Sequence, residues 1–186
     1  VSISAVDLFE ASIEKLAQQL LVQLKEAAPI QKLQPVERNG KLPLCLAQER
    51  LWFLDQLEPG NPFYNVAIAI QLTGTLKVET LQQSLNEIVK RHETLRTSFA
   101  VVDGQPVQVI HRSVDISLPI VDCTDQDFIL KETQQPFNLS QPPLLRAKLL
   151  RVQSQEHLLL LTMHHIISDG WSIGVFLKEL AALYEA

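Results

Sequence analysis

The sequence predicts an α+β protein in which helices pack on a mixed β-sheet. Segments with apolar residues at helical spacing are interspersed with short segments rich in leucine and β-branched residues, and this mixture favours a sheet covered by helices. The composition supports a packed core, because 46% of the 186 residues are hydrophobic and 20% are charged. At usual domain sizes, this length corresponds to one domain, or to one domain and a fragment.

Charge and cysteine content limit the partners and the compartment. The 16 basic and 21 acidic residues give a net charge of −5, which argues against nucleic acid or an anionic membrane as the main partner. Residues 158–167 are the most apolar stretch, but histidines interrupt it and it is about half as long as a membrane span. Because no signal peptide is in view, Cys45 and Cys123 are interpreted as reduced, largely buried thiols, which predicts a cytoplasmic protein.

The first 43 residues are predicted to form a helix and a linker. Residues 12–24 carry apolar side chains at helical spacing, and Ser12 is a candidate N-cap. Residues 25–43 contain three prolines among polar residues, which predicts an extended linker because each proline fixes φ and lacks a backbone donor. Since the chain begins with Val1 rather than methionine, we expect it to be part of something longer.

The main domain is predicted to begin near Leu44 and to mix helices with strands. Helices are predicted where apolar residues recur at helical spacing, over residues 47–57, 78–92, 127–134 and from 172 onward. Strands are predicted over residues 65–73, 97–102, 106–112, 116–121, 144–153 and 157–164. Asp103 and Gly104 predict a tight hairpin turn between two of these strands. In the first helix, we expect Leu51, Trp52 and Leu54 to be buried.

The residues best suited to chemistry are 164–170, which read His-His-Ile-Ile-Ser-Asp-Gly. An apolar strand runs into two adjacent histidines, and a turn and a helix follow. Histidine exchanges a proton near neutral pH, and loops between strands and helices present reactive groups on a rigid scaffold. Because side chains alternate along a strand, only one of His164 and His165 is expected to face a given pocket. The other is expected to be hydrogen-bonded within the fold.

Structural interpretations of the same residues stay open at this point. Both histidines could be satisfied structural residues at a strand end. His165 and Asp169 could instead be metal ligands, but the remaining histidines show no ligand-like spacing, so we expect no metal. For Asp169 we expect a structural role in which it caps the helix or pairs with an arginine, with Arg91 and Arg96 as the candidates. These arginines are otherwise interpreted as helix-end caps or ion-pair partners.

Several stretches resemble the condensation domains of nonribosomal peptide synthetases. The His-His-x-x-x-Asp-Gly pattern at residues 164–170 is similar to the signature of that family. Residues 46–54 and 91–99 resemble its first and second core motifs, and the residues between them fit as well. The resemblance covers residues 44–186. It implies the N-terminal lobe of a two-lobed, chloramphenicol-acetyltransferase-like fold, and a lobe that is inactive by itself.

A second resemblance concerns the start of the chain. Residues 1–24 resemble the last helices of a peptidyl carrier domain. With residues 25–43 as the linker, this implies a junction between a carrier domain and a condensation domain inside a multimodular synthetase. The implied partners are the upstream and downstream carrier domains and an adjacent adenylation domain.

The resemblance implies formation of an amide bond between a carrier-bound aminoacyl or peptidyl donor and a carrier-bound aminoacyl acceptor. His165 would act as general base or position the amine, while His164, Asp169 and Gly170 support its loop. Backbone N–H groups around Gly170 could help to bind the oxyanion. No cofactor is expected to bind directly, because the 4′-phosphopantetheine arms of the carriers deliver the substrates. The order Trp171-Ser172 resembles the subtype that joins an L donor to an L acceptor.

Two other functions compete with this one. The first is a stand-alone acyltransferase of the same fold that uses acyl-coenzyme A, against which the carrier-like residues 1–24 argue. The second is a module without catalytic activity that only docks carriers, against which the intact His165 argues.

Overall fold

The computed structural model describes residues 41–122 and 126–186. The predicted helix over residues 12–24, most of the linker and Cys123 lie outside the described residues. Within the described ranges, no helix is both long enough and apolar enough to cross a membrane.

The larger of two sheets has four strands in the order β2-β7-β6-β5. They are β2 (Asn65–Thr73), β7 (Glu156–His164), β6 (Leu145–Gln153) and β5 (Ile120–Asp122). Strands β2, β7 and β6 pair antiparallel, whereas β5 runs parallel to β6, so the sheet is mixed as the sequence predicts. Strand β7 lies between β2 and β6, and this central place fits its nearly continuous apolar sequence.

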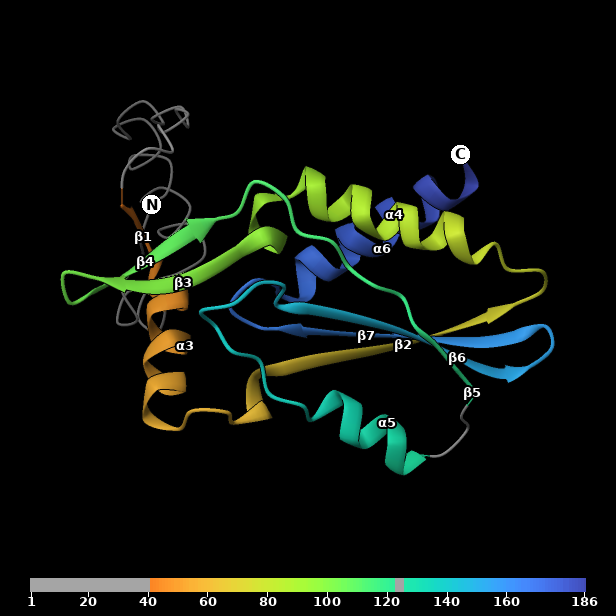
Figure 1. Ribbon diagram of the computed structural model, residues 1–186, viewed down its shortest axis with the longest axis horizontal. Helices are drawn as coiled ribbons and strands as arrows, with labels where there is room; N and C mark the ends of the chain where they lie inside the picture. The colour runs from red at the N-terminus through yellow and green to blue at the C-terminus, as the bar shows by residue number, and fades with distance from the viewer. Residues whose placement is uncertain (1–40, 123–125) are drawn as a thin grey trace, which may run out of the picture. The chain divides into compact units, whose positions relative to one another are not determined.

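Helices cover both faces of this sheet. Helix α4 (Val78–Arg91) and helix α6 (Gly170–Glu185) lie on one face, and α5 (Gln126–Thr133) lies on the other (Figure 1). The apolar stripe of α4 is buried at the spacing that the sequence predicts, through Leu81, Leu85, Ile88 and Val89. Burying each of these large aliphatic side chains contributes roughly 1.5–3 kcal/mol. The α+β class is therefore confirmed.

The smaller sheet has the strand order β1-β4-β3. It consists of β1 (Leu42–Pro43), β4 (Gln105–Ile110) and β3 (Thr97–Val102). The turn between β3 and β4 has positive φ angles of 52° at Asp103 and 75° at Gly104, as a tight hairpin requires. Residues 42 and 43, predicted to belong to the linker, pair instead with β4, because an edge strand tolerates a proline.

Helix α3 (Leu46–Leu57) forms where it is predicted but is less buried than expected. None of its residues is fully buried, and Leu51 and Trp52 are only partly buried against the core. Cys45, expected to be a buried thiol, is exposed because it is the N-cap that precedes this helix. Helix α3 thus packs one partly buried face against the core but does not belong to the core itself.

The predicted strand over residues 116–121 is shorter in the structure, which has strand pairing only over Ile120–Asp122. Ile116 and Leu118 are buried nonetheless. The backbone N–H of Ile116 donates to Oδ1 of Asn86 at 2.7 Å, and its carbonyl accepts from Nδ2 of Asn86 at 3.2 Å. One side chain of α4 therefore satisfies both backbone groups of Ile116 outside any strand pairing.

Candidate active site

The loop that carries the two histidines joins the end of β7 to the start of α6. His164 is the last residue of β7, and its backbone N–H donates to the carbonyl of Leu144 at 3.0 Å. The backbone N–H of His165 donates to the carbonyl of Tyr64 at 2.8 Å, on the side of β2. The backbone of the histidine pair is therefore held from both sides.

His164 is a buried residue with an exposed fraction of 3%. Its ring lies beside those of Tyr64 and Phe137, with centroids 6.4 and 6.2 Å away, and its Nδ1 accepts the backbone N–H of Ile166 at 3.1 Å. Burial, together with the charge of the neighbouring His165, lowers the pKa of His164 to about 4. The ring is therefore neutral near pH 7 and serves the structure of the loop.

His165 is exposed and lines a cavity of about 590 Å³. Its Nδ1 lies 2.5 Å from the backbone carbonyl oxygen of Ser168. Because a carbonyl oxygen only accepts, Nδ1 carries the proton in this contact. In the neutral ring, the lone pair is then on Nε2. The two histidines lie in the opposite environments that strand alternation predicts, and His165 is the one that can accept a proton from a ligand.

Side chains from two distant segments hold the carbonyl groups of this loop. Oγ1 of Thr94, in the short 3-10 helix η2 (Glu93–Arg96), donates to the carbonyl of Ile167 at 3.0 Å. Nε2 of Gln48, in α3, lies 3.4 Å from the carbonyl of Ile166. Reasoning from sequence did not single out Thr94 or Gln48, although both lie in the two stretches that resemble core motifs.

Asp169 is the N-cap of α6. The backbone N–H of Ser172 donates to Oδ1 of Asp169 at 2.8 Å, and the backbone N–H of Asp169 donates to Oγ of Ser172 at 2.8 Å. The hydrogen bonds from Ser172, first its backbone N–H and then its side chain, hold the pKa of the Asp169 carboxyl below its ordinary value. The helix-capping role expected for Asp169 is thus present in the structure.

The two candidate arginines have other partners. Nη1 of Arg91 lies 3.1 Å from Oε2 of Glu179, which also contacts Nε2 of His92 at 3.0 Å. Arg96 donates to the carbonyl of His111 at 2.6 Å and forms an ion pair with Glu93 at 3.6 Å. Among the described residues, neither arginine forms an ion pair with Asp169, because the start of α6 already satisfies that carboxylate. The expected arginine pairing of Asp169 is therefore replaced by the helix cap.

Gly170 is the first residue of α6. A Cβ atom at this position would have no heavy atom within 4 Å in the described part of the chain. The backbone N–H groups of Ser172 and Trp171 both face the carboxylate of Asp169. Two of the N–H groups suggested as oxyanion donors are therefore already engaged.

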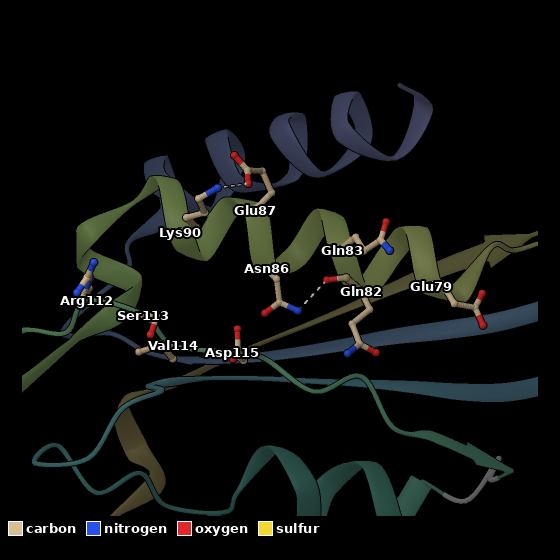
Figure 2. A pocket seen from close by; sticks show the side chains of 10 residues that line it. All are labelled: Glu79, Gln82, Gln83, Asn86, Glu87, Lys90, Arg112, Ser113, Val114 and Asp115. Carbon is tan, nitrogen blue, oxygen red and sulfur yellow. Dashed lines mark hydrogen bonds and ion pairs between the residues drawn. The ribbon is translucent and has the colours of Figure 1, made fainter.

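A second pocket of about 500 Å³ lies between α4 and residues 112–115 (Figure 2). None of its lining residues lines the His165 cavity. Its polar side chains bond locally: Lys90 pairs with Glu87 at 3.4 Å, and Nδ2 of Asn86 donates to the carbonyl of Gln82 at 3.1 Å. Asn86, which lines this pocket, also bonds to the backbone of Ile116. In the described ranges, no cluster of three or more His, Cys, Asp or Glu side chains is arranged to hold a metal ion.

Comparison with known proteins identifies the class that the fold and the histidine loop define. The model of the condensation-domain family matches residues 38–186, so the chain belongs to this family. It is 50% identical over 165 residues to one of the linear gramicidin synthase proteins of Brevibacillus parabrevis, a match that covers 83% of this chain and 2% of that protein. It is 43% identical over 157 residues to surfactin synthase subunit 2 of Bacillus subtilis, covering 83% of this chain and 4% of that protein.

Solved structures agree with this identification. The starter condensation domain of rhizomide synthetase superposes with a TM-score of 0.72 at 28% identity, over 78% of this chain and 37% of that one. The X-domain from teicoplanin biosynthesis superposes with a TM-score of 0.74 at 32% identity, over 81% of this chain and 34% of that one. The resemblance to condensation domains of nonribosomal peptide synthetases is confirmed, and the chain spans only a part of such a domain.

Proposed function

We propose that this chain supplies the histidine-bearing part of a domain that forms amide bonds between two carrier-bound substrates. The observation that supports this most directly is the geometry of His165, whose Nδ1 donates to the carbonyl of Ser168 and whose ring lines an open cavity. The donor is an aminoacyl or peptidyl thioester, and the acceptor is the α-amine of an aminoacyl thioester. A base with its lone pair on Nε2 suits this reaction, because the attacking amine must lose a proton.

The reaction consumes no reactant other than the two substrates, and His165 is regenerated at its end. The amine nitrogen attacks the thioester carbonyl, the new C–N bond forms and the C–S bond breaks. Nε2 of His165 accepts the hydrogen bond that positions the amine, takes its proton, and returns it to the departing thiolate. A positioned acid–base group of this kind contributes roughly 10²- to 10⁴-fold in rate.

The finer assignments are part of the same proposal. The order Trp171-Ser172 after Gly170 supports the subtype that joins an L donor to an L acceptor. Residues 1–24 are proposed as the end of a carrier domain, residues 25–43 as a linker and residues 44–186 as the condensation lobe. The partners are the flanking carriers, whose 4′-phosphopantetheine arms bring the substrates, and an adenylation domain, in a cytoplasmic synthetase.

The test compares His165→Ala with wild type in the complete domain, with both carriers loaded. The expected result is a loss of amide formation of about 10²-fold or more in a variant with the melting temperature of wild type, because His165 is exposed. Gln82→Ala, in the pocket beside α4, is the matched control and is expected to keep wild-type turnover. Wild-type turnover by a folded His165→Ala variant would contradict the proposal.

One observation favours a second candidate donor. A solved relative, a variant of the rhizomide starter condensation domain, is described in complex with C8-CoA at 28% identity to this chain. The alternative function is therefore transfer of an acyl group from coenzyme A. Assaying the same acceptor with a carrier-bound donor and with the matching coenzyme A thioester separates the two. Faster turnover of the coenzyme A thioester would favour the alternative.

A further inference from the structure

A small cavity of about 160 Å³ is lined in part by Ile167 and Ser168 of the histidine loop. It is formed by η2, the end of β7 and the first turns of α6. Buried apolar side chains line it, Leu95, Met163 and Phe176 among them. Trp171 and Val175 also line it, with exposed fractions of 84% and 37%. The cavity is therefore built partly from the core and partly from side chains that reach solvent.

This cavity shares one wall with the His165 cavity. Four residues line both of them, Thr94, Ile167, Ser168 and Ser172. The hydroxyl of Thr94 donates to the carbonyl of Ile167 at 3.0 Å, so this hydrogen bond joins two residues of the common wall. The His165 cavity and the small cavity are therefore direct neighbours.

The polar groups of the small cavity are bonded to the protein itself. Oγ of Ser168 donates to the carbonyl of His164 at 3.2 Å, and Oγ of Ser172 donates to the carbonyl of Asp169 at 3.0 Å. Nε2 of His92 contacts Glu179 at 3.0 Å. Because these groups already have partners, the surface that remains for a ligand is mainly apolar, and a polar ligand group would lose its hydrogen bonds to water there.

The volume limits the ligand to a small apolar group. A protein cavity of about 150 Å³ lined by Leu, Ile and Phe side chains binds benzene, so a cavity of similar size accepts an isobutyl or phenyl group. An indole group is larger and would require the walls to move.

We propose that this cavity, called here the side-chain cavity, receives the aliphatic or phenyl side chain of an aminoacyl thioester that reacts at His165. The proposal rests on the proposed function, since it assumes that such substrates react there. Donor and acceptor both carry aminoacyl groups, so both can present this chemistry, and the experiment separates them.

The test uses two substitutions at Val175, which lines the side-chain cavity but not the His165 cavity. Val175→Trp fills the side-chain cavity and Val175→Ala enlarges it. Each variant is assayed in the complete domain with glycyl, leucyl, phenylalanyl and tryptophanyl acceptors and one fixed donor, and then with the same series as donors. Ala181→Trp, at an exposed position of the same helix, is the matched control.

For the substrate that enters the side-chain cavity, Val175→Trp is expected to lower the ratio of kcat/KM for leucyl over glycyl by about 10-fold or more, the scale of discrimination by an apolar pocket. Val175→Ala is expected to raise the ratio for tryptophanyl over leucyl, and Ala181→Trp is expected to change neither. The donor and acceptor series show which of the two side chains is bound. Unchanged ratios in both series would overturn the side-chain cavity while leaving amide formation intact. If wild type forms no amide with any pair, the proposed function fails as well.

Discussion

His164 and His165 are adjacent in sequence but differ in the work that each can do. His164 is buried against two aromatic rings, and its Nδ1 already accepts a backbone N–H. His165 reaches the cavity with Nδ1 bonded to a backbone carbonyl. His164 therefore stabilises the loop as a neutral ring, and His165 presents a lone pair to the cavity.

The lowered pKa of His164 predicts a pH dependence of stability. An unfolded histidine has a pKa of about 6.5, whereas the pKa of His164 in the folded protein is about 4. Between these two pH values, the unfolded state is therefore protonated at His164 while the folded state is not. Stability from this group is complete above pH 6.5 and is lost as the pH falls toward 4. The free energy of unfolding lost in this way is on the order of 3 kcal/mol in total.

The measurement is urea unfolding of this protein at pH 7, 5.5 and 4.5, with His164→Asn as the comparison. Asparagine keeps an acceptor for the backbone N–H of Ile166 but does not titrate. Between pH 7 and 4.5, the variant is expected to lose less free energy of unfolding than wild type does. Parallel pH profiles for the two proteins would show that His164 does not contribute in this range.

Asp169 is predicted to stabilise the start of α6 as an exposed cap. Asp169→Ala removes the acceptor for the backbone N–H of Ser172, so we expect the melting temperature to fall by about 2–4 °C, the scale of a lost N-cap in a protein of this size. Asp169→Asn keeps an acceptor oxygen, so its melting temperature is expected to fall less. Thermal unfolding of both variants is the check. If Asp169→Ala has the melting temperature of wild type but is inactive, Asp169 takes part in the reaction and not only in the helix cap.

At the scale of elements, the histidine loop is positioned by its contacts with η2 and α3. Thr94→Val removes the hydroxyl that holds the carbonyl of Ile167 while keeping the shape of the side chain. We expect kcat to fall by about 3- to 10-fold in the complete domain, which corresponds to one lost hydrogen bond. KM is expected to change less, because the contact acts on the loop that carries His165.

Thr94→Ser supplies the conservative comparison for this element. Serine restores the donor, so kcat is expected to return toward the wild-type value. A loss of kcat in Thr94→Ser together with wild-type kcat in Thr94→Val would indicate that packing of the methyl group matters and that the hydrogen bond does not.

At the scale of the whole molecule, the described surface carries large exposed apolar side chains. Leu46, Phe53 and Leu57 of α3 are 85%, 56% and 61% exposed, and Phe63 is 78% exposed. The chain also spans only 37% of the solved rhizomide condensation domain to which it is similar. An apolar surface of this kind is typical of a protein face that is covered by another part or partner.

We therefore predict that this chain by itself folds but does not form amide bonds. The cavity at His165 is open as the described residues form it, so residues 41–122 and 126–186 do not enclose the two substrates. The measurement is amide formation with loaded carriers, first with residues 1–186 alone and then with the complete domain. Measurable amide formation by residues 1–186 alone would contradict this prediction.

The sequence by itself determined the features that depend on local spacing. The stripe of α4, the Asp103-Gly104 hairpin turn and the separation of His164 from His165 all follow from helical or strand periodicity and from turn chemistry. The histidine motif also identified the loop around which the cavity is built. Each of these features involves residues a few positions apart, so neighbouring side chains and backbone angles are sufficient to specify it.

Only the tertiary structure decided which distant groups meet at the loop. Thr94 is 73 positions from Ile167, and Gln48 is 118 positions from Ile166, so these contacts depend on how η2 and α3 pack around the end of β7. The exposure of Cys45 and the partners of Arg91 were likewise set by packing, through the position of α3 and the contact of Arg91 with Glu179 on α6. Periodicity shows which face of an element is apolar, but the partner of each polar group is chosen by the topology that brings elements together.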